Sequence, residues 1–114
     1  IFIPRSRKRG NLKKLKALTS AFEKAWNLAA DSDYWNATIL NGIATSAILN
    51  SDPHIITNLI NSGALCATIS GNGPSIMAIT KKQNITNVKK QFSSLDGITI
   101  ISHINNKKAE VHEV

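Results

Sequence analysis

Two short runs of apolar residues, joined by a loop of small residues, constrain the fold of this chain more than any other feature. The first run covers residues 65–69 and the second covers residues 76–79. Both runs are continuously apolar and too short for ordinary globular helices, which is typical of buried strands. The loop between them contains only Ser, Gly, Asn and Pro, residues that favour tight turns. The pattern therefore predicts two buried strands connected by a tight loop over residues 70–75.

Helical periodicity dominates the chain before this hairpin. Apolar residues recur at spacings of three and four over residues 11–30 and again over residues 33–50. Asp52 followed by Pro53 predicts the start of a third, shorter helix, because an N-capping residue stands directly before a proline at the first helical position. We expect this third helix to end near Gly63.

The remaining segments complete an alternating order of strands and helices. Residues 1–4 and 98–101 are short apolar runs, and residues 109–111 have the composition of a last strand. Residues 84–97 have the apolar spacing of a fourth helix, capped by the Asn at its start and stopped by the Gly at its end. This order predicts an α+β fold. We expect a ferredoxin-like sandwich, with helices covering one face of a mainly antiparallel sheet.

The composition is that of one ordinary globular domain. A chain of 114 residues is long enough for one core and too short for two full lobes. Hydrophobic residues make up 42% of the chain, and no apolar run approaches the roughly 18 residues of a membrane span. The one cysteine, Cys66, cannot form an internal disulfide. We therefore expect a single soluble, cytoplasmic domain over residues 1–114 with no membrane partner. The sequence starts at Ile1, inside an apolar run, which suggests a piece of a longer protein.

Positive charge is concentrated near the beginning of the chain, whose net charge is +7. Residues 5–16 hold seven of the 14 lysines and arginines and no acidic residue, whereas residues 17–114 hold seven charges of each sign. The basic residues of this cluster are Arg5, Arg7, Lys8, Arg9, Lys13, Lys14 and Lys16. Such a cluster suits a nucleic acid or an anionic small ligand, and a solvated basic loop explains it equally well.

The 70–75 loop is the candidate binding site. It consists of Ser70, Gly71, Asn72, Gly73, Pro74 and Ser75. Its two glycines flank one small polar residue, so the backbone can turn sharply, present N–H groups outward and admit a ligand without obstruction by a Cβ atom. The serines add hydroxyl groups at both ends, and the proline stiffens the exit. These features suit an anion, although a hairpin turn built on Asn-Gly explains the same residues equally well.

Residues 63–78 resemble a family signature. Their sequence, GALCATISGNGPSIMA, is similar to the third, C-terminal signature of the GHMP kinases, in which a small-residue strand enters Ser-Gly-x-Gly-Pro-Ser/Thr and leaves toward a strand bearing alanine. Within that superfamily the chain most resembles archaeal-type shikimate kinases, through this string and through residues 33–42 and 104–109. Asn72 departs from the small hydroxyl residues that are usual in the family loop.

The resemblance implies an ATP-dependent phosphotransferase. It would transfer the γ-phosphoryl group to a hydroxyl of shikimate, with Mg²⁺, in the route to aromatic amino acids. The resemblance also implies a two-lobe protein, of which this chain would be the C-terminal lobe and the N-terminal lobe its partner. The family's ATP loop, Pro-x-x-x-Gly-Leu-Gly-Ser-Ser-Ala, belongs to the N-terminal lobe and does not occur here, nor does a Walker-type loop. We therefore expect ATP and Mg²⁺ to be bound mainly by that lobe and this chain to be inactive alone.

The resemblance also bears on individual residues. It implies that the 70–75 loop lines the cleft between the lobes, where it either supports the ATP loop or donates to the phosphoryl acceptor region, and it leaves the catalytic residues unknown. Arg5 and Arg7 could hold the carboxylate of shikimate, because a guanidinium pairs with a carboxylate through two hydrogen bonds. A solvated basic loop remains the alternative for both. Asn41 is a further candidate for the cleft.

Other candidate residues have structural explanations. Trp35, at helical spacing, is expected in the core, and Cys66 is expected to be a buried, inert thiol. The three histidines, His54, His103 and His112, show no ligand spacing, so we expect no metal site in this chain.

Two alternative functions stay open. The first is a GHMP kinase with another substrate, such as homoserine or a mevalonate-type compound. The second is a small basic module that binds nucleic acid through residues 5–16. Only 5% of the residues are aromatic, and no strand alternates aromatic and basic residues as single-strand binders do, which argues against nucleic acid.

Overall fold

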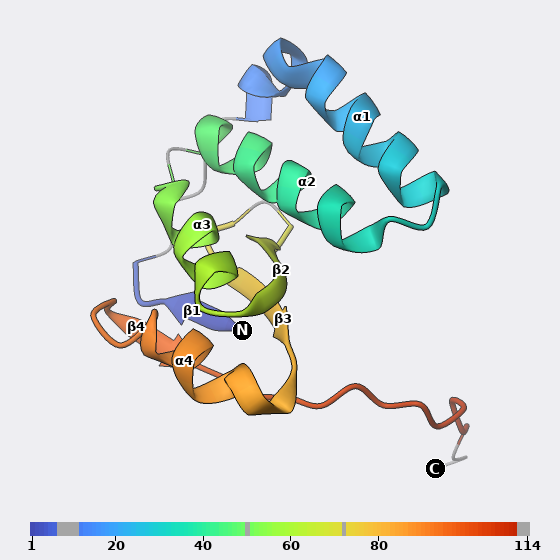
Figure 1. Cartoon of the computed structure of the whole chain (residues 1–114). Coiled ribbons are helices and arrows are strands. Elements are labelled where there is room, and N and C mark those ends of the chain that lie inside the picture. The colour runs from blue at the N-terminus through green and yellow to red at the C-terminus, as the bar shows by residue number, and fades with distance from the viewer. Residues whose placement is uncertain (7–11, 50, 72, 112–114) are drawn as a thin grey trace.

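A four-stranded antiparallel sheet lies at the centre of the fold (Figure 1). The structure, a computed structural model, describes residues 1–6, 12–49, 51–71 and 73–111. The strands lie in the order β2-β3-β1-β4, with these bounds: β1 Phe2–Pro4, β2 Ala64–Ile69, β3 Ile76–Thr80 and β4 Gly97–Thr99. Four of the predicted strands are thereby confirmed within a few residues. The predicted strand at residues 109–111 is wrong, because that segment is exposed and pairs with no strand in the described part of the chain.

Along the sequence, helices both precede and follow the β2–β3 hairpin, as the periodicity predicted. Their bounds are α1 Thr19–Ala30, α2 Tyr34–Ile48, α3 His54–Asn61 and α4 Ile85–Lys90. Two 3-10 segments, η1 (Leu12–Leu18) and η2 (Lys82–Asn84), lead into α1 and α4. The first predicted helix is therefore a 3-10 segment followed by an α-helix. The lysines of η1 are exposed, and the segment contacts both α1 and α2.

Hydrogen bonds from aspartate side chains fix two helix starts. Asp33 accepts a hydrogen bond from the backbone N–H of Asn36 at 3.3 Å and so caps α2. Asp52 accepts from the backbone N–H of His54 at 2.9 Å, which anchors the start of α3 one residue later than the sequence predicted. The predicted Asn84 cap does not form. Its side-chain amide instead donates to the carbonyl of Gly63 at 3.2 Å and ties the start of α4 to the end of α3.

Helices cover both faces of the sheet, which corrects the prediction that they cover one. Alternate residues of a strand point to opposite faces. The face that carries Phe2 packs against α4 and the turn that follows it, where Phe2 stacks on Phe92 with ring centroids 5.2 Å apart. The opposite face carries Thr68, and α2 lies against it so closely that a Cβ on Gly42 would be 3.1 Å from the Cβ of Thr68. Figure 1 shows α1 and α2 on one side of the sheet and α4 on the other.

The hydrophobic core joins the C-terminal end of α2, the helices α3 and α4, and the sheet. Its buried members are Phe2, Ile48, Leu49, Ile56, Leu59, Ala64, Ala67, Ile69, Ile76, Val88 and Phe92. Helix α1 packs on α2 rather than on the sheet, so one side of α1 and the start of α2 stay open to solvent.

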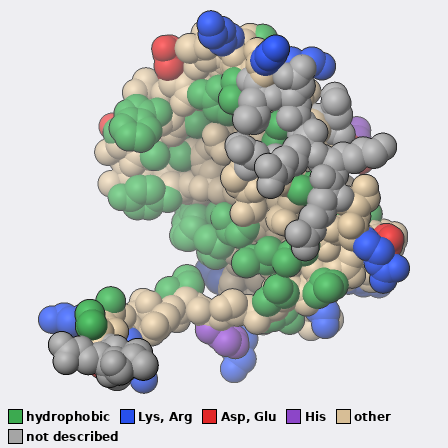
Figure 2. Space-filling view, turned by 180° about the vertical axis from the view of Figure 1, so that it is seen from behind, with side chains coloured by type: hydrophobic (Ala, Val, Ile, Leu, Met, Phe, Trp, Pro, Cys, Tyr) green, Lys and Arg blue, Asp and Glu red, His purple; other side chains and the backbone are tan. Residues whose placement is uncertain are grey.

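Two tryptophans lie outside this core. Trp35, expected in the core, is 44% exposed, and Trp26, placed by its spacing on the apolar stripe of α1, is 75% exposed. Figure 2, seen from behind, shows hydrophobic side chains on the surface of this helical part of the molecule, at the left of the view. Helical spacing therefore identified the apolar stripe of each helix but not how much of it is covered.

Candidate functional site

The 70–75 loop joins β2 to β3 and closes on itself through two backbone hydrogen bonds. The N–H of Ser70 donates to the carbonyl of Ser75 at 2.7 Å, which extends the pairing of the two strands into the loop. The N–H of Gly73 donates to the carbonyl of Ser70 at 3.0 Å, which closes a four-residue turn. The predicted tight loop is therefore confirmed. Asn72 lies outside the described residues.

The hydrogen bonds within the loop decide which of its donors can reach a ligand. The sequence predicted a run of outward N–H groups, but those of Ser70 and Gly73 are engaged inside the loop. Among the described residues, the N–H groups of Gly71 and Ser75 and the hydroxyls of both loop serines have no hydrogen-bond partner. These four donors lie within a span of a few residues. They can be offered to an anionic group that approaches from solvent.

The two loop glycines have different roles. Both have positive φ, +55° at Gly71 and +71° at Gly73, a conformation that favours glycine. A Cβ on Gly71 would meet no atom within 4 Å, so this residue faces open space. A Cβ on Gly73 would lie 3.2 Å from Ile69 and 3.3 Å from Leu49, so this residue packs against the core. Gly71 is therefore a point of the loop that a ligand can approach closely, and Gly73 anchors the loop.

The basic segment leaves the sheet at the same edge as the loop. Phe2 pairs with Ile76, and because β1 and β3 are antiparallel, the end of β1 and the start of β3 lie at one edge. The chain that follows Pro4 thus emerges beside the 70–75 loop. Arg5, in the described part of this segment, is exposed. The fold therefore brings the start of the basic cluster and the candidate loop to one end of the molecule.

Arg5 has a partner of its own. Its Nε lies 3.5 Å from Oδ1 of Asp96, in an ion pair whose side chains are 82% and 73% exposed. Its backbone N–H donates to the carbonyl of Asp96 at 3.0 Å, continuing the β1–β4 pairing. An exposed pair of this kind can exchange its carboxylate for another at little cost. Arg7, with Lys8 and Arg9, lies outside the described residues.

Asn41 stands in the middle of α2, half-buried and next to Gly42. Its side chain makes no hydrogen bond to the described residues, and its place in a cleft stays a prediction. Gly42 itself is the residue that sequence reasoning missed. A Cβ there would lie 2.7 Å from the carbonyl oxygen of Ala67 and 2.8 Å from the Cα of Thr68, so the absence of a side chain lets α2 touch the strand that leads into the loop. Its only sequence signal is a glycine inside a helical pattern.

The remaining titratable candidates behave as structural residues. Cys66 is fully buried, and burial raises the pKa of its thiol, which keeps it protonated and unreactive. Within the described ranges, no three His, Cys, Asp or Glu side chains gather closely enough to hold a metal ion. His112 lies outside those ranges. Every helix of the described chain also falls short of the length and hydrophobicity of a membrane span.

Comparisons with known proteins point to one kind of enzyme. Over 93 residues, 82% of this chain, the sequence is 31% identical to the shikimate kinase of Methanobrevibacter smithii. It is 30% identical over 100 residues to the shikimate kinase of Methanothermobacter thermautotrophicus, and 34% identical over 74 residues to that of Pyrococcus furiosus. No protein-family model matches the chain, and no solved structure matches it.

The matched regions are only part of these relatives. The chain spans 32% of the Methanobrevibacter protein, 35% of the Methanothermobacter protein and 27% of the Pyrococcus protein. The chain is thus shikimate-kinase-like in sequence over most of its own length, and it spans about a third of the length of the curated relatives it matches.

Proposed function

We propose that this chain is the C-terminal lobe of a shikimate kinase of the archaeal type. The intact protein would transfer the γ-phosphoryl group of ATP to a hydroxyl of shikimate. One observation carries the proposal: archaeal shikimate kinases are about 30% identical to this chain over 82% and 88% of its length. Similarity over that length takes in the helices and the hairpin together rather than a single short motif.

The strand order supports the architecture that the family resemblance implies. In a ferredoxin-like sandwich the chain forms two interleaved strand-helix-strand units, and adjacent strands are antiparallel. Here β1 and β2 are separated in space by β3, and β3 and β4 are separated by β1. This interleaved order is the one expected of such a sandwich. We propose accordingly that residues 1–114 form the GHMP-type C-terminal domain and that a second lobe faces it.

We assign the 70–75 loop to the cleft between the two lobes. Phosphoryl transfer needs groups that position the acceptor and neutralise the charge that develops on the transferred phosphoryl oxygens. The N–H groups of Gly71 and Ser75, which have no partner among the described residues, and the two serine hydroxyls are donors of the right kind for a phosphate or carboxylate oxygen. Arg5, at the same edge of the sheet, supplies positive charge for the carboxylate of shikimate.

ATP and Mg²⁺ are assigned to the other lobe. The described residues contain no cluster of carboxylates or histidines that fits a metal ion, and the sequence contains no phosphate-binding loop of the ATP-binding kind. The acceptor hydroxyl of shikimate would attack the γ-phosphorus, ADP would leave, and a general base would accept the hydroxyl proton.

The first experiment measures ADP release by the intact protein with ATP, Mg²⁺ and shikimate. Turnover that depends on shikimate is expected. Absence of shikimate-dependent turnover, or turnover with homoserine or mevalonate instead, would overturn the assignment of shikimate as the substrate.

A loop variant then tests the site. Gly71→Asn keeps a residue that tolerates positive φ and places a side chain in the open space at the loop. It should lower kcat/KM by about 10-fold or more while the protein stays folded, because the added side chain would obstruct the approach to the loop donors, and donors that serve the transition state are worth on the order of 100-fold in rate. Ser94→Asn, in an exposed turn, is the matched control and should stay within about twofold of the parent. Equal kcat/KM for both variants would remove the loop from the site.

A further inference from the structure

Asp96 and Gly97 form an Asp-Gly pair at the exposed start of β4. The backbone nitrogen of a residue that follows an aspartate can attack the aspartate side chain and close a succinimide ring. The reaction is easiest when that residue is glycine, because no Cβ atom obstructs the approach. A folded protein suppresses the reaction wherever the nitrogen or the carboxylate is engaged. The four aspartates of this chain differ in this respect; they are Asp31, Asp33, Asp52 and Asp96.

Three of the four aspartates are blocked by their surroundings. The N–H group that follows Asp31 donates to the carbonyl of Ala29 at 3.0 Å. Asp33 uses both carboxylate oxygens, because Oδ1 accepts from the backbone N–H of Asn36 at 3.3 Å and Oδ2 accepts from its side-chain amide at 2.8 Å. Asp52 precedes a proline, which has no N–H group. Each of the three therefore lacks either an available nitrogen or an unengaged carboxylate.

The N–H group of Gly97 faces away from its partner strand. β1 and β4 are antiparallel, with Pro4 opposite Gly97. The N–H of Arg5 donates to the carbonyl of Asp96 at 3.0 Å, so Arg5 and Asp96 are a hydrogen-bonded pair, and the next pair along the strands is not. β4 is an edge strand of the sheet, and the N–H of Gly97 has no partner among the described residues. The attacking nitrogen is therefore available.

The side chain of Asp96 is open to solvent. It is 73% exposed, and Oδ1 lies 3.5 Å from Nε of Arg5 in an exposed ion pair. Such a pair breaks at little cost. Asp96 itself lies in the bend that precedes β4. Its carboxylate can therefore turn toward the nitrogen of Gly97.

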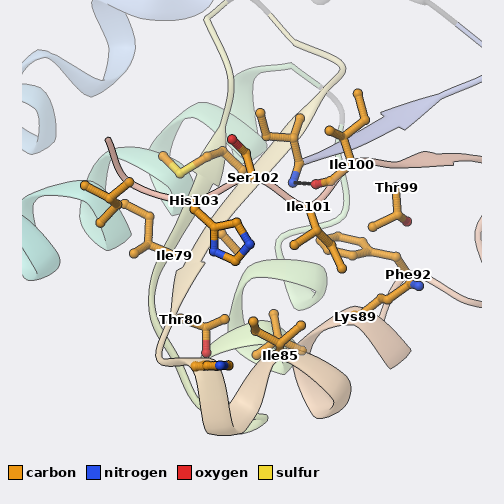
Figure 3. A pocket seen from close by; sticks show the side chains of 16 residues that line it. Ile79, Thr80, Ile85, Lys89, Phe92, Thr99, Ile100, Ile101, Ser102 and His103 are labelled. Carbon is orange, nitrogen blue, oxygen red and sulfur yellow. Dashed lines mark hydrogen bonds between the residues drawn. The ribbon is translucent and has the colours of Figure 1, made fainter. Parts of the chain in front are cut away.

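Packing explains why glycine occupies position 97. A Cβ atom on Gly97 would collide with the carbonyl oxygen of Ile3 and would lie 2.6 Å from Cζ of Phe2. The ring of Phe2 is held by its stack on Phe92, which lines one cavity together with Thr99, the last residue of β4 (Figure 3). The inner side of β4 thus requires a residue without a side chain. The same residue leaves its nitrogen unobstructed on the outer side.

We propose that Asp96–Gly97 is a site of spontaneous isomerisation, at which the folded protein converts Asp96 to isoaspartate. The nitrogen of Gly97 would bond to Cγ of Asp96, and its hydrogen would leave as water with the hydroxyl of the protonated carboxyl group. A water molecule would then open the ring at the main-chain carbonyl. The backbone would afterwards run through Cγ, and the former main-chain carbonyl would be a free carboxylate. The net composition is unchanged, so no oxidant or reductant is needed.

Isomerisation would weaken the pairing of β1 with β4. The carbonyl of Asp96 that accepts from Arg5 would leave the backbone, and the backbone would gain a methylene group at this point. The register that places Pro4 opposite Gly97 would therefore be lost at this end of the strands. The proposal concerns this strand pair and is independent of the proposed function.

Peptide mapping of the intact protein after long incubation in neutral buffer tests the proposal. Reversed-phase chromatography separates peptides with aspartate from those with isoaspartate, and electron-transfer fragmentation distinguishes them. Isoaspartate should accumulate at Asp96 severalfold faster than at Asp31, Asp33 or Asp52. Asp96→Glu is the matched control, because it keeps the charge but would have to close a larger ring. This variant should show no such product at position 96 while its circular dichroism matches that of the parent.

The unfolded chain separates the effect of the fold from that of the dipeptide. A peptide of residues 91–101 should isomerise, and in urea Asp31 should react as well, because its neighbouring N–H is released. Absence of isoaspartate at Asp96 in the folded protein would overturn the proposal, and the peptide would then show whether the fold or the chemistry prevents the reaction. Equal rates at Asp31 and Asp96 in the folded protein would also overturn it.

Amide hydrogen exchange tests the structural consequence. The amide of Arg5 should exchange faster in the aged parent protein than in aged Asp96→Glu, because only the parent loses the carbonyl that accepts from it. Equal exchange in the two proteins would contradict the weakening of the β1–β4 pair. None of these measurements uses shikimate turnover, so failure here and failure of the kinase assignment are distinguishable.

Discussion

Arg5 is the described member of the arginine pair proposed to hold the substrate carboxylate, and it already holds an ion pair with Asp96. Two substitutions in the intact protein separate its roles. Arg5→Gln should raise the KM for shikimate about 10-fold, because a charge-assisted pair contributes roughly 1.5–3 kcal/mol. Asp96→Asn breaks the same ion pair and leaves the guanidinium in place, so its KM should stay near the parent value. Steady-state kinetics with shikimate as the varied substrate make the measurement.

The comparison of these two variants also shows what would contradict the assignment. If Arg5 acts only by joining β1 to β4, both variants should change KM and stability alike. The exposed ion pair itself is expected to contribute no more than about 1 kcal/mol to the free energy of unfolding. Equal kinetic effects from Arg5→Gln and Asp96→Asn would therefore assign Arg5 a structural role.

Cys66 links stability to pH. Burial raises the pKa of its thiol in the folded protein, so the folded state keeps the proton to higher pH than the unfolded chain does. This contribution to stability is fully present below the unfolded thiol's pKa of about 8.5, and it is lost as pH rises through the folded pKa. Urea unfolding of the parent and of Cys66→Ala, each at about pH 7.5 and about pH 9.5, measures this contribution to stability. The stability of the parent relative to the variant should fall at the higher pH; a constant difference would contradict the buried thiol.

At the scale of elements, the contact between α2 and β2 depends on Gly42. Gly→Ala inside a helix normally stabilises by about 1 kcal/mol. Here the added Cβ would lie 2.7 Å and 2.8 Å from backbone atoms of β2, so helix and strand must separate. Gly42→Ala should therefore lower the free energy of unfolding by about 1–2 kcal/mol, since overpacking a tight contact costs roughly 1–3 kcal/mol. Chemical denaturation of the intact protein checks this value.

The control for this prediction lies on the same helix. Ala47 is exposed, and Ala47→Gly should destabilise by about 1 kcal/mol through helix propensity alone. Removing a Cβ at 47 and adding one at 42 should thus both destabilise the protein. If Gly42→Ala stabilised it, the close packing of α2 on β2 would be refuted.

At the scale of the whole molecule, the basic cluster at residues 5–16 distinguishes a small anionic substrate from a nucleic acid. Its described lysines, in η1, are exposed, and the net charge of the chain is +7. A module that bound nucleic acid through this cluster would release several counterions, and its affinity would fall steeply with salt. We expect no measurable binding of mixed-sequence RNA or DNA by the intact protein at about 0.15 M salt. Tight binding that is lost when Arg5, Arg7, Lys8 and Arg9 are neutralised would favour the alternative function, a module that binds nucleic acid.

Periodicity and turn chemistry in the sequence determined most of the local structure. The apolar runs at 65–69 and 76–79 predicted short strands, and the small residues between them predicted a tight loop, because both signals are local. The hydrogen bonds that Asp33 and Asp52 accept at the starts of α2 and α3 are local as well. The extent of the candidate loop therefore follows from the sequence alone.

Contacts between distant segments decided the rest. Trp35 has the spacing of a core residue, yet it is 44% exposed, because other residues of α2, such as Ala37 and Ala44, form its buried face. The side chain of Asn84 has a cap's chemistry but reaches the carbonyl of Gly63, which only the fold brings near. Which loop amides lack a partner among the described residues depends on the pairing of Ser70 with Ser75. A linear pattern specifies which residues share a face of one element, whereas the partner of that face is fixed by packing across the sequence.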